Sequence, residues 1–390
     1  MKSKDNKITV FLGLFNADKY LDSLFNQIIS QDNQNFNLLV VDNNSSDKTF
    51  EKVESWRNTF SQRLQMVRNP INYGAYGSLF KNIEKIKTPW FCWLHQDDLY
   101  KPNHINTFLE IIPNAGKDII GISTTMGSLA NNGKILNSKP RITWFASELD
   151  QAGQFLQNLR AQAFPDPASA YKLEIFKKTI IPFHSSAFPD TEHTLRMLGY
   201  GKFLVSQEET MLYRENPFSI SHVLNPKERL LGAAVSLLRV FNSEEFETLL
   251  STIKKEKRGE FAKQLLDALP LRFPDGDLLK VIELSALEKI LLIWGYEQKN
   301  VSELLLKKYA AFSTSLTIST LSNLSKLGYT PVTLSTNNLV ETLNAKNKIW
   351  NLYFNLKYPI IIQYNKKILK TVYRIIFIFN PNHRWKNRWQ

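Results

Sequence analysis

Short apolar runs alternate with amphipathic stretches along the first third of the chain. The apolar runs predict strands over 8–14, 37–41, 64–67 and 90–94, and the amphipathic stretches predict helices over 17–30, 48–60 and 76–85. This alternation is typical of βα units that build a mostly parallel sheet. In such sheets the loops at the carboxyl ends of the strands converge to bind ligands, and polar residues gather there in this sequence.

The pattern changes after residue 118. A hairpin is expected between 122–129 and 134–136, with a tight turn at 131–133, followed by a helical and loop-like stretch over 145–164 and renewed order over 168–176. Beyond Pro226 only helical periodicity is convincing, over 227–241, 243–269, 277–296 and 301–309. We therefore expect a catalytic domain over 1–226, a helical domain over 227–345 and a separate tail over 346–390.

Composition agrees with two packed domains. The 390 residues are 43% hydrophobic, enough to bury one full core and a second smaller one. Cys92 is the single cysteine and lies in an apolar run, which predicts a buried thiol and excludes an intramolecular disulfide. The polar N-terminus lacks the apolar core of a signal peptide, so we expect a cytoplasmic protein.

The net charge of +13 is concentrated in the tail. No Asp or Glu follows Glu341, whereas ten Lys and Arg do, interleaved with aromatic and aliphatic residues. This composition is typical of a segment that lies on an anionic bilayer, and no run reaches the roughly 18 apolar residues of a spanning helix. The tail thus predicts peripheral contact with the cytoplasmic membrane leaflet, with a basic protein-binding surface as the alternative. A nucleic-acid partner is not expected, because a nucleic-acid-binding protein would spread its basic residues along a groove, whereas here they are concentrated in the tail.

Two polar clusters follow predicted strands. Asp42 ends the second strand and opens a run of short polar residues through Asp47, where a carboxylate can accept from a nucleobase or ribose, or these residues can simply cap the next helix. His95, Gln96, Asp97 and Asp98 follow the buried strand 90–94. Adjacent carboxylates repel, so a divalent cation, Mg²⁺ or Mn²⁺, would explain the pair, with His95 as a further possible ligand; a helix cap is the plainer explanation.

The order and spacing of these clusters resemble the family 2 glycosyltransferases, over roughly residues 8–100. Residues 15–21 look like the first strand-to-helix turn of that family, residues 41–47 like its nucleotide-binding strand end, and residues 72–75 like its third loop. The family's Asp-x-Asp metal motif falls on 95–98, with His95 in place of the first Asp. The resemblance implies a GT-A fold, α/β with a Rossmann-like, mostly parallel sheet, here followed by a mainly helical region. It implies donor contacts from Phe15, Asn16, Asp42, Asn44, Asn72, Gly74, Gln96, Asp97 and Asp98, and metal ligation by Asp97 and Asp98.

The resemblance extends more faintly to residue 221. Asp190 falls six residues before Arg196, the spacing at which the family carries its catalytic base, and Glu192 is the alternative base. A cap for a helix over 191–198 is the alternative role for Asp190. Residues 213–221 are similar to the family's closing motif, with Asn216 where a His is usual. One base facing one leaving group implies inversion at the anomeric carbon.

The expected activity is therefore transfer of a sugar from a nucleotide-diphosphate donor, most commonly UDP-linked in this family. The acceptor would be a hydroxyl of a glycan or lipid-linked molecule in bacterial surface polysaccharide synthesis, such as capsule or lipopolysaccharide. A scaffold that kept the fold without the chemistry is the alternative, given His95 and Asn216. A dehydrogenase is disfavoured, because no Gly-x-Gly-x-x-Gly follows a predicted strand.

Overall fold

The computed structural model describes residues 7–141, 148–161, 163–180, 189–215, 226–271 and 277–294. Contacts divide the chain into two compact units, and the division falls between Asn225 and Pro226. The first unit is an α/β domain built on one large sheet, and the second is helical. Each unit is described by itself below.

The first half of the sheet is parallel, as the sequence predicts. Its strands lie side by side in the order β3 (Leu64–Arg68), β2 (Phe36–Asp42), β1 (Ile8–Leu14) and β4 (Trp90–Leu94). Ile8 pairs with Phe36 on one side and with Trp90 on the other. Nearly every residue of β1, β2 and β4 is buried, because helices cover both faces of a parallel sheet.

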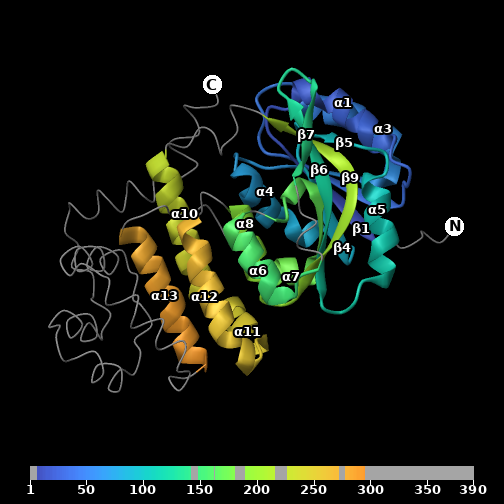
Figure 1. The fold of residues 1–390 in the computed structure, drawn as a ribbon. Coiled ribbons are helices and arrows are strands. Elements are labelled where there is room, and N and C mark those ends of the chain that lie inside the picture. Colours follow the sequence, from blue (N-terminus) through green and yellow to red (C-terminus); the bar gives the residue numbers. More distant parts are fainter. Residues whose placement is uncertain are drawn as a thin grey trace, which may run out of the picture. The chain divides into compact units, whose positions relative to one another are not determined.

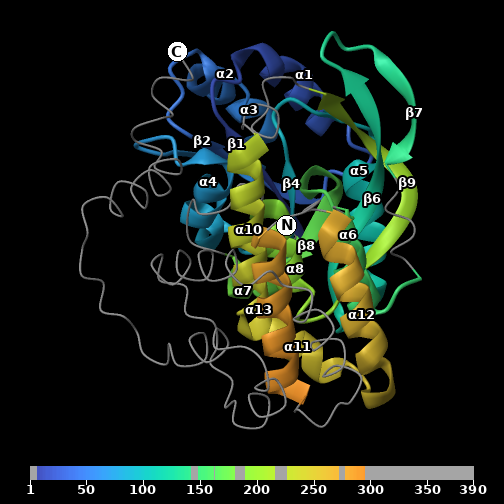
Figure 2. The same ribbon diagram turned by 60° about the vertical axis from the view of Figure 1, so that its left-hand side comes forward.

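The second half of the sheet mixes strand directions. β8 (Ser169–Lys172) pairs antiparallel with β4 and with β6 (Ile119–Ala130), and β9 (Lys202–Glu215) pairs parallel with β6. β5 (Leu99–Tyr100) pairs antiparallel with β9. The predicted hairpin is confirmed, because β7 (Ile135–Arg141) pairs antiparallel with β6. Figure 2 shows β7 at the right-hand edge of the domain. Gly133, in the turn, has a left-handed backbone with φ 86°.

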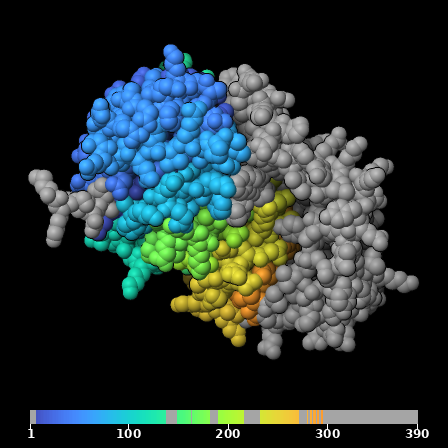
Figure 3. Space-filling model, turned by 180° about the vertical axis from the view of Figure 1, so that it is seen from behind, coloured from blue at the N-terminus to red at the C-terminus, as the bar shows by residue number. Residues whose placement is uncertain are grey.

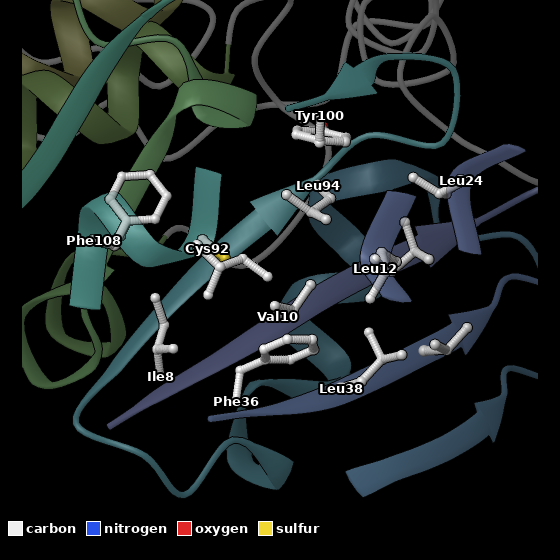
Figure 4. Packing of buried hydrophobic residues seen from close by; sticks show 14 of the residues in the cluster. Ile8, Val10, Leu12, Leu24, Phe36, Leu38, Cys92, Leu94, Tyr100 and Phe108 are labelled. Carbon is white, nitrogen blue, oxygen red and sulfur yellow. The ribbon is translucent and has the colours of Figure 1, made fainter. Parts of the chain in front are cut away.

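One face of the sheet packs against α1 (Asp18–Ile29), α2 (Thr49–Ser55), α3 (Arg57–Phe60) and α5 (His104–Ile111). Figure 4 shows the core beneath them, where Leu24 lies near Leu12 of the central strand and Phe108 lies near Cys92 of β4. Cys92 lies in this core, and burial raises the pKa of its thiol to about 12, which confirms the predicted buried cysteine.

The other face is covered by α4 (Gly74–Asn82), α6 (Gln151–Arg160), α7 (Leu173–Thr179) and α8 (Pro189–Met197), as Figure 1 shows. Phe91 of β4 packs edge-on against Phe176 of α7, with ring centroids 4.7 Å apart. The first βα units, coloured blue and cyan, form a continuous area of surface in Figure 3. Short 3₁₀ turns complete the unit at 61–63, 83–85, 112–114 and 166–168.

The second unit contains α10 (Pro226–Phe241), α11 (Glu244–Thr252), α12 (Arg258–Ala268) and α13 (Asp277–Trp294), with 3₁₀ turns at 255–257 and 269–271. The sequence predicts one helix over 243–269, but the chain extends at Ile253 (φ −78°, ψ 118°) and splits it in two. The Trp294 indole ties α13 to α11 by donating to the Leu250 carbonyl at 2.8 Å. Within the described residues, every helix is too short or too polar to span a bilayer. The predicted helix 301–309 and the tail 346–390 lie outside the described residues.

Candidate active site

The predicted site residues of the first three βα units meet at one edge of the sheet. Leu14 at the end of β1 pairs with Asp42 at the end of β2, and Leu12 pairs with Leu94 at the end of β4. Parallel register therefore places the turns after these strands side by side. Residues 15–17, 43–47 and 95–98 lie in those turns.

Hydrogen bonds fasten the first two turns to each other. The Asn16 amide donates to Ser45 Oγ at 3.0 Å, and the Ser46 amide donates to Asn16 Oδ1 at 2.9 Å. Asn16 and Asn44 both have left-handed backbones, at φ 47° and 64°, a conformation that Asn tolerates better than most residues. The side chain of Asn16 is thus engaged by the neighbouring turn, while Asn44 is exposed. Both remain predicted donor contacts.

Asp42 is fully buried and ion-paired. Its Oδ2 lies 3.2 Å from Nε of Arg68 at the end of β3, and its Oδ1 accepts from the Ser45 amide at 3.1 Å. The Arg68 guanidinium also donates to the Ser45 carbonyl at 2.9 Å and lies over the Phe50 ring, 4.8 Å from its centroid. Arg68 is a site residue that the sequence reasoning missed, although its place at a strand end was a usable signal.

Asn43 organises the third turn. Its Oδ1 accepts from the Tyr73 amide at 3.1 Å, and its Nδ2 donates to Asn72 Oδ1 at 2.6 Å. Asn72 Oδ1 also accepts from the amide of Gly74, which begins α4 at φ 73°. Asn72 and Gly74 are therefore set beside the second strand end, as the prediction of donor binding requires, and Asn43 holds them there.

Gln96 joins the third cluster to the first turn. Its Oε1 accepts from the Phe15 amide at 2.9 Å, and its Nε2 donates to the Phe15 carbonyl at 3.1 Å. Both polar atoms of the Gln96 side chain are thus bonded to one residue of the protein. Direct donor contacts from Phe15 and Gln96 stay predictions, and the geometry shows that the two residues fix the turn that carries them.

The paired carboxylates have different surroundings. Asp98 is buried, and its Oδ1 accepts from the Arg214 amide of β9 at 2.8 Å, whereas Asp97 is half-buried. Arg214 Nε also donates to the Asp97 carbonyl at 2.6 Å, so one residue braces both aspartates. Burial raises the pKa of Asp98 well above its usual range, and the charge of Asp97 acts in the same direction.

The residues present fit a divalent cation that is completed by phosphate oxygens. Asp98 Oδ2 is buried and accepts no hydrogen bond from the described residues; His95 Nδ1 lies 3.8 Å away. No group of three or more His, Cys, Asp or Glu is close enough to hold a metal within the described ranges. Mg²⁺ is commonly held by one or two carboxylates together with substrate phosphates, so two aspartates are sufficient.

Asp190, predicted as the base, lies in the first turn of α8 and is half-buried. Burial lowers the pKa of His95, while the charges of Asp97 and Asp190 raise it. Ring contacts connect α8 to the end of β4: the His193 ring lies 6.2 Å from that of Tyr76, Tyr76 lies 4.8 Å from Trp93, and Trp93 lies 5.6 Å from His95, measured between centroids. Glu192, the alternative base, lies two residues later in the same helical turn and is fully buried.

His193 is buried, shares a hydrogen bond of 2.9 Å with Thr179 Oγ1, and has its pKa lowered to about 3, mainly by burial. These contacts indicate a structural role for His193. Asn216 of the closing motif lies outside the described residues, as do His184 and His222.

The strand order confirms the predicted α/β domain with a parallel, Rossmann-like first half, and the second half of its sheet is mixed. Residues 9–180 match glycosyl transferase family 2. This match confirms the resemblance drawn from the motifs and identifies a family 2 glycosyltransferase domain over those residues.

Individual relatives are distant. An uncharacterized glycosyltransferase of Nostoc sp. is 22% identical over 173 residues, which cover 44% of this chain and 52% of that protein. The teichoic acid poly(glycerol phosphate) polymerase of Staphylococcus epidermidis is 26% identical over 105 residues, 27% of this chain and 15% of that one. The chain thus spans about half or less of the length of these relatives. Among solved structures, S. aureus TarS 1–349 in complex with UDP-GlcNAc is 15% identical, with 80% of this chain and 95% of that chain covered and a TM-score of 0.49.

Proposed function

We propose that this protein is an inverting glycosyltransferase that moves a sugar from a nucleoside-diphosphate donor, UDP-linked by preference, to a hydroxyl group of a glycan or lipid-linked acceptor. The observation that carries the proposal is the packing of α8, which carries Asp190, against the end of β4: His193 packs against Tyr76, Tyr76 against Trp93, and Trp93 against His95. It brings a carboxylate from a distant part of the chain towards the paired aspartates. A donor held at the strand ends would then have its leaving group on one side and a base on the other.

The donor's nucleoside is assigned to the turns after β1, β2 and β3. Asp42 and Arg68 offer a buried carboxylate and a half-exposed guanidinium beside each other, suited to a base or ribose. Asn44 is exposed at the same edge, and the turn with Asn72 and Gly74 lies next to it. Both the fastening of these turns and their polarity support this assignment.

Asp97 and Asp98 would hold Mn²⁺ or Mg²⁺, with His95 as a further candidate ligand. When bound, the cation neutralises negative charge that develops on the departing diphosphate. Asp97 is the more accessible carboxylate. Asp98 supplies a buried oxygen, Oδ2, and the Arg214 amide holds the same carboxylate by a hydrogen bond to Oδ1.

Asp190 would act as the general base. It removes the proton of the acceptor hydroxyl as the acceptor oxygen bonds to the anomeric carbon, while the bond from that carbon to the diphosphate oxygen breaks and its electron pair leaves with the diphosphate. Asp190 is preferred to Glu192 because it is half-buried, whereas Glu192 is enclosed in the domain. A single displacement inverts the anomeric configuration.

The test is release of nucleoside diphosphate from a panel of sugar nucleotides in Mn²⁺, Mg²⁺ or EDTA. Wild type should use one donor, and Asp97→Ala and Asp190→Ala should abolish transfer. Retained transfer in Asp190→Ala would move the base to Glu192. The absence of turnover with every donor would contradict the enzymatic proposal and favour a non-catalytic scaffold.

The acceptor belongs, in our proposal, to a bacterial cell-surface polymer such as capsule or lipopolysaccharide. One distant relative, the S. epidermidis polymerase, is named for a teichoic acid, which supports this class. The proposal includes peripheral binding of the tail 346–390 to the cytoplasmic leaflet, based on its ten cations and its aromatic residues. A truncation before Asn347 should lower binding to anionic vesicles, and unchanged binding would contradict the membrane role.

A further inference from the structure

A carboxylate outside the predicted site is enclosed by two tyrosines. Asp166, in the 3₁₀ turn 166–168, is only 4% exposed. Its Oδ1 accepts from the Tyr171 hydroxyl of β8 at 2.5 Å, and its Oδ2 accepts from the Tyr76 hydroxyl of α4 at 2.8 Å. A buried carboxyl group is costly without such bonds, so three separate elements have been brought together at this point.

Tyr76 is the member of the cluster that reaches towards the site. Tyr171 is fully buried, whereas Tyr76 is half-buried. The Tyr76 ring packs edge-on against Trp93, with centroids 4.8 Å apart, and Trp93 packs in the same manner against His95 at 5.6 Å. One aromatic ring therefore separates Tyr76 from the segment that carries the paired aspartates.

Two further neighbours locate Tyr76 within the site. It lies two residues after Gly74, so it follows directly on the turn that Asn43 and Asn72 hold beside the end of β2. The Tyr76 ring also packs edge-on against the His193 ring of α8, with centroids 6.2 Å apart, and Asp190 lies in the first turn of the same helix. Tyr76 thus follows the turn assigned to the nucleotide and contacts the helix that carries the assigned base.

In a single displacement the transferred sugar occupies the space between leaving group and base. An aromatic ring offers a flat apolar surface to the C–H groups of a pyranose, and a buried hydrogen bond prevents the ring from turning away. We propose that Tyr76 forms a wall of the subsite for the transferred sugar of the donor, and that Asp166 is a positioning residue that fixes Tyr76 through its hydroxyl. This inference rests on the function proposed above.

The sharpest test compares two ligands that differ only in the sugar. Calorimetry would give dissociation constants for the nucleotide sugar that wild type uses and for its nucleoside diphosphate, both with Mn²⁺. Tyr76→Ala should weaken binding of the nucleotide sugar by about tenfold and that of the diphosphate by less than about twofold. Tyr76→Phe, which keeps the ring and loses the bond to Asp166, should weaken nucleotide-sugar binding by about threefold, and Asp166→Asn should resemble it.

Tyr171→Phe is the matched control. It also removes one hydroxyl bond to Asp166, but its ring is fully enclosed, so it should lower thermal stability without changing the ratio of the two dissociation constants. Equal ratios in wild type, Tyr76→Ala and Tyr76→Phe would overturn the sugar subsite while leaving the transferase proposal intact. A protein that binds neither ligand would overturn both.

Discussion

The side chain of Gln96 closes a two-point hydrogen-bonded contact with the main chain of Phe15, accepting at 2.9 Å and donating at 3.1 Å. This contact joins the turn after β4 to the turn after β1. A hydrogen bond between Asn16 and Ser45 then connects the turn after β1 to the turn after β2. The three strand ends therefore form one connected unit, and loosening any of them should weaken donor binding.

Replacing Gln96 by Met tests this connection, because Met keeps the volume and removes both bonds. We expect a loss of about 2 kcal/mol in the free energy of unfolding, since each bond contributes roughly 1 kcal/mol, together with a raised KM for the donor. Gln154→Met is the control: Gln154 makes the same pair of bonds to the Phe203 main chain, each 2.8 Å long. It should lose stability at unchanged KM, and equal KM values in the two variants would contradict a role for the contact in donor binding.

The left-handed backbone of Gly74 supports a second comparison. A Cβ at Gly74 would meet no atom within 4 Å, so Gly74→Ala should cost only the backbone strain of about 1 to 2 kcal/mol. Gly133 has the same conformation and the same open surroundings, in the hairpin turn. Both variants should lower the melting temperature similarly in calorimetry. Only Gly74→Ala should raise the donor KM. A similar KM in both variants would show that the turn with Asn72 and Gly74 does not contribute to donor binding.

Arg214 should control metal affinity through the protein main chain. Arg214→Lys keeps the positive charge and the amide bond to Asp98 but loses the Nε bond to the Asp97 carbonyl. We expect the Mn²⁺ concentration for half-maximal activity to rise by about tenfold, with kcat at saturating Mn²⁺ nearly unchanged. Titration of activity with Mn²⁺ measures both values. An unchanged half-maximal Mn²⁺ concentration would show that the Nε bond of Arg214 does not affect metal affinity.

His104 predicts a loss of stability in acid. It is buried against the Tyr100 and Phe108 rings, its Nδ1 lies 2.8 Å from Thr210 Oγ1, and burial lowers its pKa from 6.5 to about 3. The unfolded chain therefore binds a proton below pH 6.5 that the folded chain refuses, so this histidine reduces stability progressively as pH falls from about 6.5 to about 3. The slope is about 1.4 kcal/mol per pH unit.

Urea unfolding at pH 7.5 and pH 5.0 measures this effect. The drop in the free energy of unfolding between these two pH values should be about 2 kcal/mol smaller in His104→Gln than in wild type. His193 has a similarly lowered pKa, so part of the drop should persist in the single variant. The same drop in both proteins would show that His104 is protonated in the folded state.

The parallel half of the fold was predictable because its signals are local. β1, β2 and β4 are continuous apolar runs that end in polar residues, and this pattern follows directly from burial on both faces. β9 was not predicted. Its 14 residues mix buried, half-buried and exposed positions with bulges in its pairing to β6, so neither strict alternation nor a continuous apolar run marks it.

The same division holds for the candidate site. Asp42 and Asp97 could be found because each follows a strand at a recognisable spacing. Asp166 could not, since it stands between two prolines and looks like a chain break until its partners Tyr76 and Tyr171 arrive from 90 positions upstream and 5 positions downstream. Contacts that depend on tertiary packing leave no periodic trace in the sequence.

The strand order separates the two sides of the reaction along the chain. β1 lies between β2 and β4, so every turn assigned to the donor's nucleotide and metal comes from residues 8–98, whereas Asp166 and Asp190 come from segments added beyond β4. A recombinant that exchanged residues 148–215 with those of a related enzyme would therefore replace the assigned base and Asp166 while keeping every turn assigned to the nucleotide. Such an exchange would separate nucleotide binding from the later steps of the reaction in one protein.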